Sequence, residues 1–192
     1  MHGRQAGRLA ASACCNISAK IKIKIKIKIK IKIKIKIKIK TRAYPMHPLK
    51  LRSATPDDLA LTYAITEEAM RSYVEATWGH WDEDEQLAKH QRNFTPETHQ
   101  IIVVDGVEVG FVAIEDFPSY TWLVKLYLRR DSRNLGIGSA LLRQLMDEAA
   151  AQNKPLRLQV LRVNTLAQQL YFRHGFKIAH ETAERLFLES GA

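Results

Sequence analysis

The alternation of apolar and polar residues after residue 45 predicts an ordered series of strands and helices. Residues 49–53 alternate apolar and basic side chains, which is typical of a short strand. Thr55 then caps a helix, because Pro56 suits a first helical turn and Asp58 stands where a capping box places its acceptor. A second helix is expected over 82–92.

Three strand-like runs follow this helical region. Residues 99–105 and 107–116 are rich in Val and Ile, and Asp105-Gly106 between them favours a tight hairpin whose turn needs positive φ. The third run covers 120–129. Simple alternation there puts Trp122, Val124, Leu126 and Leu128 on one face and Leu123, Lys125 and Tyr127 on the other. We expect three consecutive antiparallel strands.

The last third of the chain alternates helix and strand. A long helix is predicted from about Gly136, because Ile137, Leu141, Leu145 and Ala149 recur every four residues. A strand over 156–163 follows, and then a short helix that Asn164 caps and Gly175 ends. Two short strands, 176–180 and 185–189, complete an α/β (α+β) domain.

Charge divides the chain at residue 45. Residues 1–45 contain fourteen Lys and Arg and no acid, so residues 46–192 hold sixteen Lys and Arg against twenty Asp and Glu, a net charge of −4. This balance excludes a generally basic, nucleic-acid-coating domain for 46–192. Cys14 and Cys15 are the only cysteines, so residues 46–192 can form no disulfide and no cysteine-bearing zinc site. A reducing cytoplasm is the expected compartment.

The basic segment contains a strict Lys-Ile repeat from Lys20 to Lys40, eleven lysines around ten isoleucines. It cannot span a bilayer, because every second residue is charged. Two interpretations stay open: a cationic surface binder of membranes or nucleic acid, or translated low-complexity sequence upstream of the true start. The composition changes at Met46, which predicts a low-complexity extension over 1–45 and a folded domain over 46–192.

The segment 126–139 carries the clearest chemical signal, because a strand there runs through a glycine-containing loop into a helix. Unpaired amides at the start of a helix bind phosphate, Gly136 and Gly138 let the backbone approach it closely, and Arg133 adds a positive charge. A dinucleotide fingerprint would need a third glycine where Leu141 stands, and a Walker-type loop would need a Gly-Lys-Ser/Thr sequence that is absent. Alone, the loop is also compatible with an ordinary helix start.

Two motifs together resemble the GCN5-related N-acetyltransferase (GNAT) superfamily. Arg133-x-x-Gly136-x-Gly138 is similar to its pyrophosphate loop, and residues 164–176 resemble its second signature, Asn…Ala…Leu-Tyr…Gly-Phe. The resemblance covers 49–189; Arg130 stands where many members have proline. It implies a mixed, mostly antiparallel sheet splayed between the fourth and fifth strands and flanked by helices, with acetyl-coenzyme A as co-substrate and no metal.

The same resemblance implies roles for individual residues. Tyr171 would protonate the departing coenzyme A thiolate, although without the motif it would be read as a core tyrosine. Glu115, beside Asp116 at a strand end, is a candidate general base, and a solvated hairpin end is the alternative. Trp78 and Trp81 would line the acceptor pocket or, equally, belong to the core. The residues implied in binding acetyl-coenzyme A are Leu126, Tyr127, Leu128, Arg133, Asn134, Leu135, Gly136, Ile137, Gly138, Ser139, Asn164 and Tyr171.

The resulting prediction is an acetyl-coenzyme A-dependent N-acetyltransferase acting on a primary amine. The acceptor is a small molecule or a peptide, and a homodimer is compatible with the sequence. A non-catalytic acyl-coenzyme A sensor on the same fold is the alternative from a different class.

Overall fold

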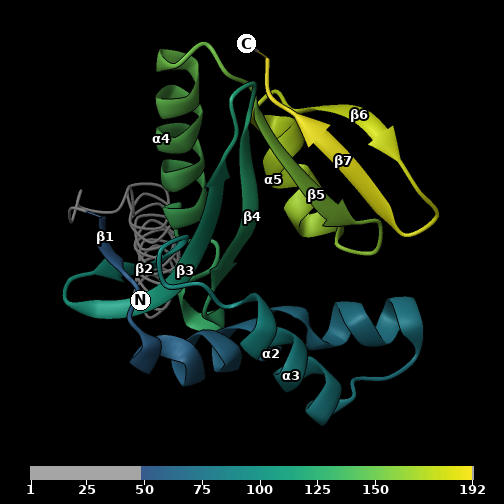
Figure 1. Ribbon diagram of the computed structural model, residues 1–192. Helices are drawn as coiled ribbons and strands as arrows, with labels where there is room; N and C mark the ends of the chain where they lie inside the picture. Colours follow the sequence, from purple (N-terminus) through teal and green to yellow (C-terminus); the bar gives the residue numbers. More distant parts are fainter. Residues whose placement is uncertain (1–48, 192) are drawn as a thin grey trace, which may run out of the picture. The chain divides into compact units, whose positions relative to one another are not determined.

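The computed structural model describes residues 49–191, which fold around one seven-stranded sheet in the order β1-β2-β3-β4-β5-β7-β6 (Figure 1). The Lys-Ile repeat and the expected boundary at Met46 lie outside these residues. The strands are β1 (Lys50–Ser53), β2 (His99–Val104), β3 (Val107–Asp116), β4 (Thr121–Leu128), β5 (Leu156–Leu161), β6 (Lys177–Glu181) and β7 (Arg185–Glu189). The helices are α2 (Leu59–Trp78), α3 (Glu83–Asn93), α4 (Ile137–Ala151) and α5 (Thr165–Arg173), with 3₁₀ turns η1 (Pro56–Asp58) and η2 (Arg130–Ser132).

The predicted α/β class and the order of elements are confirmed. The β2–β3 hairpin turns at Asp105 and Gly106, which both have positive φ, at 54° and 78°. The first helix differs from its prediction in one detail. Residues 56–58 form a separate 3₁₀ turn, and the α-helix begins at Leu59.

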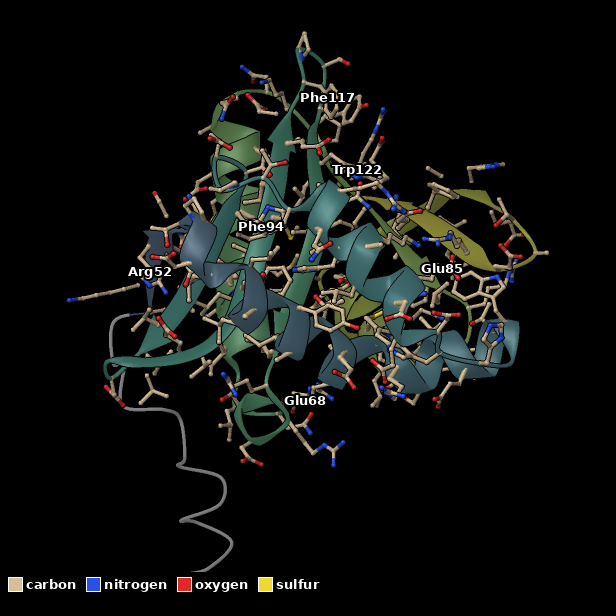
Figure 2. The ribbon with its side chains drawn as sticks, turned by 60° about the horizontal axis from the view of Figure 1, so that its bottom comes forward. Arg52, Glu68, Glu85, Phe94, Phe117 and Trp122 are labelled. Carbon is tan, nitrogen blue, oxygen red and sulfur yellow. The ribbon has the colours of Figure 1, made fainter. Side chains whose placement is uncertain are left out.

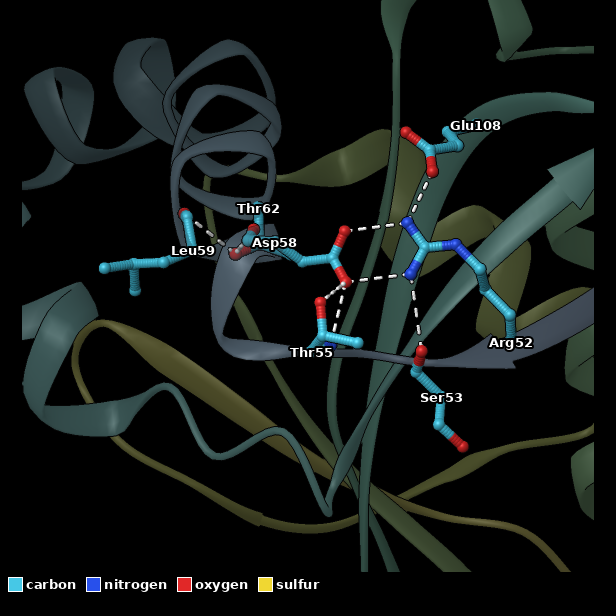
Figure 3. A network of polar contacts seen from close by, with 7 residues as sticks. All are labelled: Arg52, Ser53, Thr55, Asp58, Leu59, Thr62 and Glu108. Carbon is cyan, nitrogen blue, oxygen red and sulfur yellow. Dashed lines mark hydrogen bonds and ion pairs between the residues drawn. The ribbon is translucent and has the colours of Figure 1, made fainter.

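The junction between β1 and α2 is held by Asp58, which is 7% exposed. The Thr55 amide donates to its Oδ2 at 2.8 Å, as the predicted capping box requires. Arg52 donates to both Asp58 oxygens, at 2.8 and 2.7 Å, and also pairs with Glu108 of β3 (Figure 3). The Arg52 guanidinium holds the pKa of Asp58 well below its usual range. Asp58 and Arg52 together thus join β1, β3 and the start of α2.

Both faces of the sheet are covered by helices. Ile65 of α2 packs on Ile101 and Phe111 at one face. On the other face α4 lies against β4 and β5, with Leu141 and Leu142 fully buried, as the four-residue spacing predicted (Figure 1).

A β-bulge in β4 changes which side chains share a face. Ala113 is opposite Lys125, whereas its neighbour Ile114 is opposite Leu123, so Val124 is the extra residue. Opposed residues share a face, and Ala113 and Ile114 point to opposite faces. The predicted alternation is therefore wrong on the early side of the bulge. Leu123 shares a face with Leu126 and Leu128, and Trp122 shares one with Lys125 and Tyr127.

The sheet opens between β4 and β5, which confirms the expected splay. The two strands are parallel and pair only from Thr121↔Leu156 to Leu123↔Leu158. They lie side by side near their beginnings and diverge toward their ends, with α2 and α3 crossing below the opening (Figure 1). Pairing ends next to the bulge at Val124, because a bulge bends the strand and interrupts its hydrogen-bond ladder. None of the helices in residues 49–191 has the length and apolar character needed to cross a membrane.

Candidate active site

The open edge of β4 presents backbone groups beyond the end of its pairing with β5. The Arg129 amide donates to Val109 of β3 at 2.9 Å, so alternation turns the amides of Leu128 and Leu126 away from β3, toward the opening. The Leu128 carbonyl on that side accepts from Nε of Arg133 at 2.9 Å. The Leu126 and Leu128 amides are therefore placed to bind a ligand that enters between the strands.

Gly110 of β3 lies behind this edge and allows a close approach between β3 and β4. A Cβ atom there would lie 2.2 Å from the Tyr127 carbonyl oxygen and 3.1 Å from Cα of Leu128. No side chain fits in that space, so glycine is required for β4 to keep this position. Gly110 is not among the residues predicted from the sequence; its signal is a lone glycine inside an otherwise apolar strand.

The loop between β4 and α4 ends in a helix start with free amides. Gly136 is the N-cap of α4 with φ of 84°, and no side chain caps the helix. The first turn contains no acidic residue, so its positive end meets no internal counter-charge. Ala140 is the first residue to donate within the helix, to Gly136, which leaves the amides of residues 137–139 for a ligand. These features fit a pyrophosphate group.

The Arg133 side chain forms hydrogen bonds that hold this loop against β4 and α2. Besides its bond to Leu128, the guanidinium donates to the Glu68 carbonyl at 3.3 Å, and the Glu68 carboxylate lies 3.9 Å from the same nitrogen. The Glu68 carboxylate also accepts from the Arg130 amide. Glu68 lies on α2 beside the loop (Figure 2). The Arg133 guanidinium thus brings a positive charge to the loop, and it donates hydrogen bonds to two backbone carbonyls of the protein.

Tyr171 is held on α5 close to the opening. Asn164 caps that helix by accepting from the Ala167 amide at 3.1 Å. The Tyr171 ring is 8% exposed and packs against Phe176, with 5.7 Å between ring centroids. Burial, followed by the nearby Tyr127, raises the pKa of Tyr171 far above its usual value, so its hydroxyl keeps its proton at neutral pH. Among residues 49–191 no group forms a hydrogen bond with that hydroxyl.

A cavity of about 480 Å³ adjoins the opening, between α2 and α3 on one side and β4, β5 and β7 on the other. Trp78 and Trp81, which the sequence placed at an acceptor pocket, both line this cavity. Trp78 is 43% exposed, whereas Trp81 is 8% exposed and donates to Glu83. The other residues that line the cavity include Glu85, Lys125, Tyr127 and Arg185.

Glu115 lies outside this cavity. It is opposite Trp122 near the beginning of β4, at the end of the sheet away from Glu68 (Figure 2). The adjacent Asp116 binds Lys154 at 2.9 Å, and this contact lowers the pKa of Asp116. The proposed base is therefore not among the residues that line the cavity, and its role stays a prediction.

Lys125 is a functional candidate that the sequence analysis did not select. Its Nζ lies 3.3 Å from Nε2 of His99, and burial followed by the charge of Lys89 lowers its pKa to about 8. Nδ1 of His99 donates to the Thr95 carbonyl at 2.9 Å, so Nε2 is the acceptor from Lys125. The available signal was one charged residue inside an apolar strand.

Two buried histidines support this side of the cavity. Phe94, labelled in Figure 2, packs against the rings of both His90 and His99. Thr62 donates from Oγ1 to backbone carbonyls, so it accepts from Nε2 of His90 at 3.0 Å. Burial, followed by the charge of Lys125, lowers the pKa of each histidine to about 4. Both rings are neutral at neutral pH.

Comparison with known proteins shows what this chain is similar to. Residues 97–178 match the model of the acetyltransferase (GNAT) domain, which confirms the resemblance. No curated protein matches the chain in sequence.

Solved structures share the fold at low sequence identity. The PaiA N-acetyltransferase of Thermoplasma acidophilum, in complex with coenzyme A, has a TM-score of 0.61 at 18% identity, covering 75% of this chain and 99% of that one. The ribosomal-protein-S18-alanine N-acetyltransferase of Escherichia coli has a TM-score of 0.56 at 21% identity, covering 75% and 96%. Naa50 of Arabidopsis thaliana, in complex with a bisubstrate analogue, has a TM-score of 0.51 at 16% identity, covering 75% and 99%.

Proposed function

We propose that this chain, which carries a GNAT acetyltransferase domain over residues 97–178, transfers an acetyl group from acetyl-coenzyme A to a primary amine. The observation that carries the proposal is the opening between β4 and β5, where unpaired backbone amides and the start of α4 face one space. A coenzyme A complex of a protein with this fold supports the choice of co-substrate.

The chain offers separate groups for each part of acetyl-coenzyme A. The amides of residues 137–139 would hold the pyrophosphate, because they lack internal acceptors and lie at the positive end of α4. The edge of β4 at Leu126 and Leu128 would pair with the amide groups of the pantetheine arm, as an added strand does. Asn164 stands at the facing end of β5, where its side chain already caps α5.

The reaction follows from the same placement. The neutral amine attacks the thioester carbonyl; a C–N bond forms, and the carbonyl oxygen becomes an oxyanion that the Leu128 amide would stabilise. The C–S bond then breaks, the nitrogen loses its proton to solvent or a base, and the thiolate takes one proton. Tyr171 would supply that proton, because its hydroxyl stays protonated and has no hydrogen-bond partner within residues 49–191.

Two measurements on the full chain test this function. Calorimetry with acetyl-coenzyme A should show one binding site, and a screen of amine acceptors with thiol release as the readout should show turnover. Binding without turnover on any amine would favour the acyl-coenzyme A sensor. The absence of acetyl-coenzyme A binding would reject both functions.

A further inference from the structure

The cavity beside the opening collects positively charged side chains that form no ion pair within the described part of the chain. Lys125 of β4, Lys89 of α3 and Arg185 of β7 all line it. None of the three forms an ion pair among residues 49–191. They come from three separate elements, so the tertiary structure is what brings them to one space.

Lys125 is the most confined of these cations. Its Nζ donates to His99 and lies 5.9 Å from the Phe111 ring centroid. An ammonium group has three donors, and His99 engages one of them. Burial and the charge of Lys89 lower its pKa, which shows that the charged form lacks compensation in this environment. An anion bound in the cavity would supply that compensation.

Arg185 and the acidic residues define the rest of the cavity. The Arg185 guanidinium lies 5.8 Å from the Trp78 ring centroid. Asp82 and Glu85 of the α3 end also line the cavity, and Asp82 accepts from the Glu85 amide as the helix cap. Negative charge therefore lies at the start of α3, whereas Lys89 farther along α3, Lys125 of β4 and Arg185 of β7 bring positive charge.

We infer that the amine acceptor also carries a carboxylate, which Lys125 binds and Arg185 supports, so that the acceptor is an amino acid or an amine of similar zwitterionic character. The inference rests on the proposed function, because it assigns the acceptor of that same site. A carboxylate matches the free donors of Lys125 in a charge-assisted hydrogen bond. Asp82 and Glu85, which line the same cavity, would attract the ammonium group of such a molecule.

The same charges disfavour two other acceptor classes. A polyamine would bring a second cation beside Lys125, and like charges in a partly buried site repel each other. A protein N-terminus with a neutral first residue would place no anion near Lys125. A peptide that begins with an acidic residue would present the same amine and carboxylate chemistry, and the test separates this source from free amino acids.

The test uses the full chain and pairs of acceptors that differ only in the carboxylate. The twenty amino acids are compared with their primary carboxamides, and peptides beginning with Glu are compared with those beginning with Gln. Spermidine is included as a polyamine. Thiol release from acetyl-coenzyme A gives kcat/KM for each acceptor. Calorimetry of the protein with each acceptor, in the absence of acetyl-coenzyme A, gives the Kd of that acceptor.

The expected result is a preference of about tenfold or more in kcat/KM and Kd for the acid of at least one pair. Lys125→Met should abolish that preference and Lys125→Arg should retain part of it. Lys177→Met, which removes an exposed lysine from β6, is the matched control and should leave the preference intact. A preference in the peptide arm alone identifies an acidic N-terminus as the source of the carboxylate.

Equal or better use of the carboxamides, preferred use of spermidine, or a carboxylate preference that survives Lys125→Met would overturn the inference. Its failure is distinguishable from failure of the proposed function. If acetyl-coenzyme A does not bind, the proposed function is rejected, while the acid-over-amide difference in Kd still reports on Lys125.

Discussion

Arg133 and Leu128 are joined by a hydrogen bond of 2.9 Å from Nε of the arginine to the carbonyl oxygen of the leucine. The bond closes the segment between the last residue of β4 and the start of α4. It engages the Leu128 carbonyl and leaves the Leu128 amide for a ligand. One side chain therefore fixes the phosphate-binding loop relative to the strand edge that would hold the rest of the co-substrate.

Removing this tie should weaken acetyl-coenzyme A binding. Arg133→Met is expected to lower affinity about tenfold in calorimetry, because the loop loses its bonds to Leu128 and to the Glu68 carbonyl. Arg129→Met is the matched control, since its Nε also donates to a backbone carbonyl, that of Glu108, but on the β3 side. Equal affinities for the two variants would remove Arg133 from the binding loop.

Gly136 should be intolerant of a side chain for two separable reasons. Its φ of 84° strains any other residue, and a Cβ there would point into space that no described residue occupies. Gly136→Val is expected to lower acetyl-coenzyme A affinity by about tenfold or more. Gly106→Val carries the same backbone strain at φ of 78°, away from the site, so it should lose stability but keep its affinity. A folded Gly136→Val protein with unchanged affinity would exclude the loop.

Tyr171→Phe should reduce turnover without reducing acetyl-coenzyme A binding. The substitution keeps the ring contact with Phe176 and removes only the hydroxyl. We expect kcat and kcat/KM to fall together by about 10²-fold or more in steady-state kinetics, because the proton is given up only as the thiolate leaves. Tyr120→Phe, a tyrosine stacked on Phe117, serves as control. Kinetics of Tyr171→Phe equal to those of the control would leave Tyr171 a packing residue.

Stability should fall as the pH is lowered from about 6.5 to 4. His90 and His99 have pKa values of about 4 in the fold, below the ordinary 6.5, because they are buried. The unfolded chain therefore binds more protons in this window, and each histidine contributes a slope of up to about 1.4 kcal/mol per pH unit. Urea unfolding at several pH values measures this change in the free energy of unfolding. His99→Gln should reduce the slope by the share of His99, and a flat profile in the parent protein would contradict the neutral buried rings.

Asp58 should matter for stability and not for binding. Asp58→Ala leaves the Thr55 amide without its acceptor and removes two hydrogen bonds of the Arg52 guanidinium, so we expect a loss of about 2–3 kcal/mol in the free energy of unfolding. Glu108→Ala removes the exposed partner of Arg52 and should cost below about 1 kcal/mol. Acetyl-coenzyme A affinity should stay unchanged in both. Equal losses for the two variants would show that Asp58 adds nothing beyond a surface ion pair.

The sequence was sufficient to predict the order of the elements and the glycine-containing loop before α4. Helix and strand periods, the Asp105-Gly106 turn and the acceptor at Asp58 depend on residues near one another in the chain, so local rules decide them. The glycines at 136 and 138 were found for the same reason. The outward direction of the loop amides depends only on which residue begins α4.

Only the tertiary structure decided what lies around the acceptor. The bulge at Val124 reverses the faces of Trp122 and Leu123, and alternation cannot show it because it arises from pairing with β3. Lys125 meets His99 and Arg185 meets Trp78 across separations that no local pattern spans. Glu115, chosen for its place on a neighbouring strand, lies at the other end of the sheet. Local periodicity determines which elements form, whereas long-range packing determines which charges share a cavity, and we propose that these charges select the acceptor.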